Sequence, residues 1–141
     1  METHDTGRLA SMPRLALALL LVAATMALCG GRARAAGGVL DGKTFVGETG
    51  EVGKQKGEAE EIDFQDGTFH SRPCDPYGFG RAPYKAVTTD GVTRFEAVTT
   101  SVKEGRMAWR GTVSGDRLAG TVVWSKAGQR DIEYWVKARL K

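Results

Sequence analysis

The sequence predicts an all-β domain of about eight antiparallel strands, arranged as an up-and-down meander that closes, or nearly closes, into a barrel. Three observations support this prediction. From Leu40 onward the apolar residues recur with a period of two, which is the period of a half-buried strand. The strand-like segments are short, follow one another about every 8–12 residues and are separated by turn residues. Eight strands allow a meander to close and remove its exposed edges.

The first segment of the chain has the pattern of a secretory signal peptide. The apolar run Leu15–Leu28 follows Arg14 and precedes Ala33-Arg34-Ala35, a small-x-small end. We expect cleavage after Ala35. Residues 1–35 would then be the signal peptide, and residues 36–141 would form a single exported β-barrel domain, periplasmic or secreted.

The apolar run leaves other interpretations open. A spanning helix needs about 20 apolar residues and this run is shorter, so we expect no stable membrane span. Lipid anchoring at Cys29 is an alternative, because this cysteine directly follows the apolar run, although Leu28 is bulkier than the small residue usual before an acylated cysteine. Met12 is an alternative start, because Met12-Pro13-Arg14 would supply a compact basic flank.

Loss of the signal peptide changes the composition. The chain has 20 basic and 17 acidic residues, and residues 1–35 hold four of the former and two of the latter, so the exported part carries a net charge of +1. Nucleic-acid binding usually needs a strongly basic face, and we therefore expect no nucleic-acid partner. Of the two cysteines only Cys74 remains, which excludes an intrachain disulfide.

The first three strands are expected at 43–48, 60–65 and 68–72. The second and third flank Asp66-Gly67, which is a typical two-residue hairpin turn. This turn length pairs Phe64 with Phe69 on one face of the hairpin.

Five further strands are expected at 84–89, 92–101, 106–113, 118–125 and 130–140, and no segment has the pattern of a long helix. Their alternation predicts an inward-facing set that is large and apolar: Phe95, Met107, Trp109, Val113, Leu118, Val122, Trp124, Ile132, Tyr134 and Val136. Because the interior of an eight-stranded barrel is just wide enough for side chains or one small ligand, this set predicts a filled interior rather than a lipid-sized cavity.

Two segments resemble known small barrels. The run Trp109–Thr121 resembles the strand-turn-strand texture of calycin-like barrels of the avidin and lipocalin style, and Gly42-Lys43-Thr44-Phe45 resembles the Gly-x-Trp opening of lipocalins, with Phe45 in place of the Trp. The resemblance implies a barrel fold and, by analogy, ligand binding.

The turn residues also predict which connections share an end of the barrel. Asp-Gly or Gly-Asp pairs recur at a nearly constant spacing, and two strands return the chain to the same end, so these pairs should close one end: 41–42, 66–67, 90–91 and 115–116. The longer connections should then gather at the other end: 49–59, 72–83, 102–105 and 126–129. Long loops on a compact scaffold are where function usually lies.

The charges divide between the same two ends. The loop end holds eight cations, Lys54, Lys56, Arg72, Arg81, Lys103, Arg106, Lys126 and Arg130, against four acids, Glu51, Glu58, Asp75 and Glu104. This count predicts a basic mouth that would attract anionic partners. The alternative is that these cations are ordinary solvated surface residues.

The loop 72–83 is the least generic part of the exported chain. Asp75-Pro76-Tyr77-Gly78 fits a type I turn, and Tyr77 and Phe79 are expected to plug the mouth or, alternatively, to form one wall of a pocket. We expect Cys74 to be a small buried apolar residue. The alternatives are a nucleophile with His70, a metal ligand with His70 and Asp75, and a free redox-active thiol.

The sequence therefore favours a noncatalytic binding module of the cell envelope, without cofactor or metal, whose partner is an unknown small molecule or envelope protein. The expected ligand is small and anionic or amphipathic, and the candidate binding residues are Arg72, Cys74, Tyr77, Phe79, Arg81 and Lys126. The alternative is a structural or interaction protein, such as an inhibitor or assembly factor, acting through the 72–83 loop, with Trp135 pointing outward. An enzyme is the third class, and no catalytic motif supports it.

Overall fold

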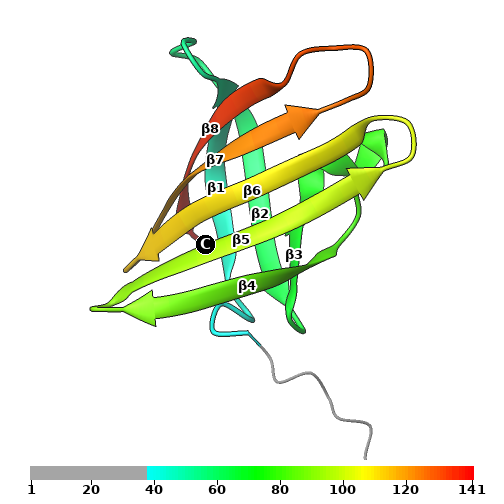
Figure 1. The fold of residues 1–141 in the computed structure, drawn as a ribbon. Coiled ribbons are helices and arrows are strands. Elements are labelled where there is room, and N and C mark those ends of the chain that lie inside the picture. Colours follow the sequence, from blue (N-terminus) through cyan, green and yellow to red (C-terminus); the bar gives the residue numbers. More distant parts are fainter. Residues whose placement is uncertain (1–37) are drawn as a thin grey trace, which may run out of the picture. The chain divides into compact units, whose positions relative to one another are not determined.

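The computed structural model describes residues 38–141, which form a closed barrel of eight antiparallel strands in chain order (Figure 1). The predicted all-β, up-and-down barrel is thereby confirmed. The predicted signal peptide, its cleavage after Ala35, the alternative start at Met12 and the lipid anchor at Cys29 lie outside the described residues. Within residues 38–141 no helix is long and apolar enough to cross a membrane.

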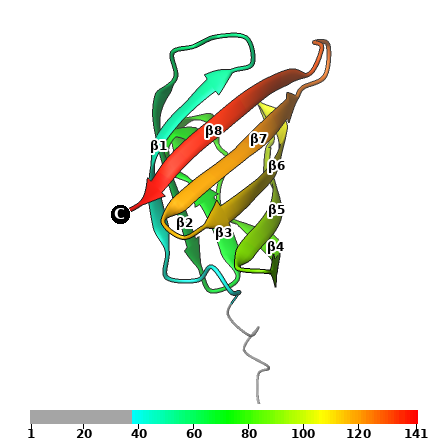
Figure 2. The same ribbon diagram turned by 90° about the vertical axis from the view of Figure 1, so that its left-hand side faces the viewer.

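Each strand pairs with the next, and β8 pairs with β1 to close the barrel (Figure 2). The strands are β1 (Thr44–Glu51), β2 (Glu58–Gln65), β3 (Thr68–Ser71), β4 (Ala82–Thr89), β5 (Val92–Ser101), β6 (Gly105–Ser114), β7 (Arg117–Ser125) and β8 (Ile132–Leu140). All eight predicted strands are present. β1 runs further than predicted, to Glu51, because its last two residues pair with Trp135 and Tyr134 of β8.

The turn end is closed tightly, as the spacing of the Asp-Gly pairs predicts. Asp66 and Gly67 have φ of 51° and 73°, and Asp90 and Gly91 have φ of 52° and 78°, as a type I′ turn requires at both central residues. The predicted pair between Phe64 and Phe69 is confirmed.

The segment before β1 ties this end together. The Asp41 carboxylate accepts hydrogen bonds from the backbone N–H of Gly67, at 3.0 and 3.1 Å, and from the Tyr84 hydroxyl at 2.8 Å. The Tyr84 oxygen in turn accepts from the backbone N–H of Leu40, whose side chain is buried. Residues 40–41 therefore cap the barrel at the turn end.

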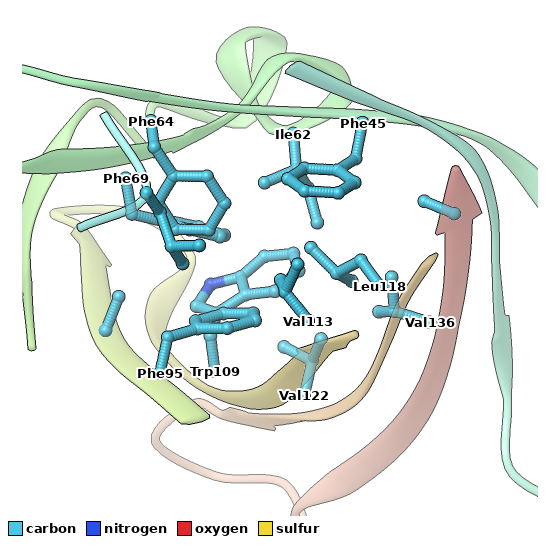
Figure 3. Packing of buried hydrophobic residues seen from close by; sticks show 13 residues of the cluster. Phe45, Ile62, Phe64, Phe69, Phe95, Trp109, Val113, Leu118, Val122 and Val136 are labelled. Atoms are coloured by element: carbon cyan, nitrogen blue, oxygen red, sulfur yellow. The ribbon is translucent and has the colours of Figure 1, made fainter. Parts of the chain in front are cut away.

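An aromatic cluster centred on Phe64 fills the adjoining half of the interior (Figure 3). The Phe64 ring makes edge-to-face contacts with four other rings, at centroid distances of 4.9 Å to Tyr84, 5.2 Å to Phe95, 5.6 Å to Phe69 and 6.2 Å to Phe45. Trp109 lies near the middle of the labelled side chains, with its ring 4.8 Å from that of Phe69. Edge-to-face pairs are favoured by the ring quadrupole, so the cluster fixes the rings as well as burying them.

The barrel wall is weakest between β3 and β4. Only Thr68 and Phe69 of β3 pair with β4, opposite Pro83 and Ala82. Beyond this short seam the chain forms a 3-10 helix, η1 (Arg72–Tyr77), where the sequence pattern predicts only a turn around Asp75–Gly78. The helix continues the wall where strand pairing stops, and it brings the 72–83 loop to the loop end of the barrel.

We predict that Phe64→Ala lowers the free energy of unfolding by about 3–5 kcal/mol, because it removes the ring that four others contact. Urea unfolding followed by circular dichroism measures the loss. Val87→Ala is the control, because Val87 is 68% exposed on β4, and it should change stability by less than about 0.5 kcal/mol. Equal losses in the two variants would contradict the assignment of Phe64 as the centre of the core.

Candidate functional site

A cavity of about 300 Å³ opens at the loop end of the barrel, where the aromatic cluster stops. Its lining comes from β1, β2, β6, β7 and β8, from η1 and from the loops that follow η1 and β5: Thr49, Glu58, Glu60, Pro73, Cys74, Tyr77, Phe79, Glu104, Met107, Trp109, Val122, Trp124 and Tyr134. Of the aromatic residues expected to face inward, Phe95 lies in the filled half of the interior, whereas Trp109, Trp124 and Tyr134 line the cavity.

A larger hollow on the outside of β4–β7 is a shallow depression in the sheet rather than a cavity. Its floor includes Gly111 and Gly120, which pair with each other and carry no side chains. A Cβ at Gly111 would lie 2.6 Å from the Phe95 ring, which is too close for two carbon atoms. The inward packing of Phe95 therefore requires a glycine at position 111. The mouth cavity is the candidate site because it is concave, largely apolar and lined by a few convergent polar groups.

The indoles of the site are held by hydrogen bonds. Trp109 is buried at the floor, and its Nε1 donates to Thr99 Oγ1 at 3.1 Å. Trp124 lies nearer the mouth, and its Nε1 donates to the backbone carbonyl of Glu104 at 2.6 Å. Both ring nitrogens are therefore satisfied within the protein. The rings are left to contribute apolar surface to the cavity.

The least expected residue of the lining is Glu60. It is only 2% exposed, and its Oε1 accepts a hydrogen bond from the Ser71 hydroxyl at 2.8 Å. Burial raises the pKa of Glu60 to about 7, an effect that hydrogen bonds from Ser71 and the Glu61 backbone partly offset. Glu60 is not among the site residues expected from the sequence. Its signal was the alternation of β2, since Glu60 is in phase with the inward-facing Ile62 and Phe64.

The candidate residues of the 72–83 loop divide between the cavity and its rim. Cys74, Tyr77 and Phe79 all line the cavity. Phe79 is buried, as expected of a plug, whereas Tyr77 is 61% exposed. The loop thus forms a wall of the cavity and leaves the mouth open, which is the alternative arrangement that the sequence allowed.

Arg72, Arg81 and Lys126 do not line the cavity. Arg72 Nε lies 3.0 Å from Glu61 Oε1, and Arg81 pairs with Asp63, which points outward from β2. Lys126 Nζ is 2.9 Å from Glu104 Oε2.

The lining therefore differs from the expected basic mouth. Its charged residues are Glu58, Glu60 and Glu104, and none of the described lining residues is a lysine or an arginine. The physical reason is that a count of charges assigns residues to an end of the barrel but not to a face of its wall. The cations at this end lie on outer positions or in ion pairs, as Lys54 does with Glu51 at 2.6 Å.

Asp63 is the acidic centre of a polar network on the outer wall, where it contacts His70, Arg72 and Arg81. Burial by itself would raise the pKa of this carboxyl, but its hydrogen bonds and charge interactions with Arg81 and His70 hold the pKa below its usual value. His70 Nδ1 lies 3.2 Å from Asp63 Oδ2, and its Nε2 lies 2.6 Å from Asp75 Oδ1. This network fastens the 72–83 loop to β2 and β3.

Cys74 and His70 are not brought together as a nucleophile and base. Cys74 Sγ lies 3.2 Å from Ser71 Oγ and 3.8 Å from Met107 Sδ, whereas both ring nitrogens of His70 face carboxylates. Burial raises the pKa of the Cys74 thiol, so the thiol stays protonated at neutral pH. Among residues 38–141 no three His, Cys, Asp or Glu side chains are grouped closely enough to hold a metal ion.

Trp135 points outward, as predicted, but its side chain packs against the β1–β2 loop of the same chain. Its Nε1 donates to the Lys54 carbonyl at 3.0 Å, and the ring lies against Gly50 and Gly57. Lys137 Nζ is 5.3 Å from the ring centroid on the outer face. The indole therefore anchors the β1–β2 loop beside the mouth.

Comparison of the chain with protein-family models, with curated proteins and with solved structures gave no match.

We predict that Glu60→Gln removes a pH dependence of stability. A carboxyl whose pKa is raised in the folded state favours folding in its protonated form, so its contribution is present below about pH 4.5 and is lost as the pH rises through about 7. The full effect is at most about 3 kcal/mol. Relative to wild type, the variant should therefore gain stability between pH 5 and pH 8.

Urea unfolding at the two pH values measures this difference. Glu96→Gln, an exposed change on the outer face of β5, should keep the wild-type dependence. An unchanged pH dependence in Glu60→Gln would show that Glu60 is not ionising in a buried site.

Proposed function

We propose that this protein is a noncatalytic binding module that takes one small amphipathic ligand into the mouth cavity and works in the cell envelope, as a periplasmic or secreted protein. The single observation that carries the proposal is a cavity of about 300 Å³ with indole and phenol walls and a buried carboxylate. Export is supported by the signal-peptide pattern around Leu15–Leu28.

The size and chemistry of the cavity support a small ligand. Ligand pockets are usually of about 300–1,000 Å³, are mostly apolar and carry a few placed polar groups. At about 300 Å³ the cavity suits a molecule with one ring or a short chain rather than a long acyl chain. Of the two ligand classes expected from the sequence, the amphipathic class fits better, because the charged lining residues are carboxylates.

The other two classes of function have less support. The best catalytic candidates, Cys74 and His70, have separate partners, and the buried thiol is protonated. An interaction protein would need exposed apolar side chains to contact its partner. Phe79 of the 72–83 loop is buried, and Trp135 packs against the β1–β2 loop of the same chain. Tyr77 alone remains as an exposed aromatic residue in the 72–83 loop.

The three tryptophans supply the test. Trp109 and Trp124 line the cavity, and Trp135 lies on the outer wall. We predict that titration with 2-phenylethanol, a neutral amphipathic probe, shifts the indole N–H signals of Trp109 and Trp124 in ¹⁵N-correlated NMR spectra and leaves that of Trp135 in place. Equal shifts of all three signals, or a shift of the Trp135 signal alone, would contradict binding in the cavity.

A filled cavity is the matched control. Val122→Phe adds a ring at the cavity floor, and Val98→Phe makes the same change at an exposed position of β5. If the probe occupies the cavity, Val122→Phe should weaken its binding and Val98→Phe should not. Thermal unfolding of both variants checks that each is folded.

A further inference from the structure

The charged groups that face the mouth cavity are all acidic, but they are not equivalent. Glu104 forms an ion pair with Lys126, and Glu58 is exposed to solvent at the start of β2. Glu60 is the only one of the three that is buried. An opposite charge at Glu60 would be least screened by water, so Glu60 is the group from which a ligand charge would gain most.

The protein provides Glu60 with hydrogen-bond donors but with no ion pair, because His70, whose charge favours the ionised form of Glu60, faces Asp63 and Asp75 instead. The Ser71 hydroxyl donates to Oε1, and in the described part of the chain no lysine or arginine forms an ion pair with this carboxylate. A buried carboxylate without a cation is costly, and buried charges in proteins are usually paired. The position is therefore suited to a cation that arrives from outside.

The other walls of the cavity suit the rest of such a ligand. Trp109, Trp124 and Tyr134 present aromatic surface, with Met107 and Val122 between them. Aromatic faces attract cations and also cover apolar groups. An ammonium group next to an apolar body would match both the carboxylate and the rings.

Building on the proposed binding function, we propose that the ligand is a small organic amine, whose ammonium group pairs with Glu60 while its apolar part packs against Trp109, Trp124 and Tyr134. The carboxylate selects for the positive charge, and the volume of about 300 Å³ limits the apolar part to about one ring or a short chain. Glu104 does not compete for the ammonium group, because Lys126 already neutralises it.

The test compares three probes that share a phenyl ring and differ in charge: 2-phenylethylamine, 2-phenylethanol and phenylacetate. At pH 8 Glu60 is mostly ionised, and the amine stays charged, since alkylamines titrate near roughly pH 10. Binding of each probe to the exported domain, residues 36–141, is followed through the indole N–H signals of Trp109 and Trp124. We expect the amine to bind at least about ten-fold more tightly than the alcohol, and phenylacetate to bind most weakly.

Two variants assign the preference to a residue. Glu60→Gln keeps an acceptor for Ser71 but removes the charge, so the amine should lose its advantage over the alcohol. Glu96→Gln removes an exposed charge from the outer face of β5 and should leave the advantage intact.

The outcomes separate the amine inference from the proposed function. Equal binding of the three probes, or tighter binding of the alcohol or phenylacetate, would overturn the amine inference and leave the binding function standing. An amine preference that survives in Glu60→Gln would overturn the role of Glu60. Failure of all three probes to shift the cavity indoles would overturn both proposals.

Discussion

The packing around Phe64 is the interaction on which the rest of the molecule depends. Its ring contacts four other aromatic rings, and Trp109 borders this cluster through Phe69. With Leu40 and Asp41 capping the same end, the turn half of the interior is filled. The barrel has no comparable cluster at the loop end, where Trp109 and Val122 become the floor of the cavity. The rings of the Phe64 cluster pack directly against one another, whereas the aromatic side chains at the loop end surround a hollow, and this difference in packing is what leaves room for the cavity.

The wall beside the cavity depends on a chain of polar contacts. Strand pairing between β3 and β4 ends after two residue pairs, and Ser71, the last residue of β3, donates to the buried Glu60. η1 begins at the next residue, and the outer network of Asp63, His70 and Arg81 fastens the loop that follows. Glu60 lies at the junction between the barrel wall and the η1 segment, so its ionisation bears on stability and on the proposed site together.

Local signals in the sequence were sufficient for most of the fold. Alternation located all eight strands, and the two-residue turn at Asp66-Gly67 fixed the Phe64–Phe69 pair. The extension of β1 to Glu51 and the contacts of Asp41 with Gly67 and Tyr84 had no local signal, because they arise from partners distant in the chain.

The site was less predictable than the fold. Cys74, Tyr77 and Phe79 were placed at the cavity because the 72–83 loop must cover the loop end. Arg72 and Arg81 belong to the same loop, yet they pair with acids on the outer wall, and a sequence count of charges cannot assign them to a face. Glu60 could have been found by extending the inward phase of Phe64 and Ile62 by one more step along β2.

The most direct measurement is a crystal structure of the protein soaked with 2-phenylethylamine at pH 8. We predict electron density for one probe molecule in the mouth cavity, with its nitrogen within hydrogen-bond distance of a Glu60 carboxylate oxygen and its ring against Trp109 or Trp124. The rings around Phe64 should remain packed against one another, with no probe between them. An interior in which the side chains of the 72–83 loop fill the mouth, or a probe bound only on the outer wall, would contradict the division of the barrel into a packed half and a binding half.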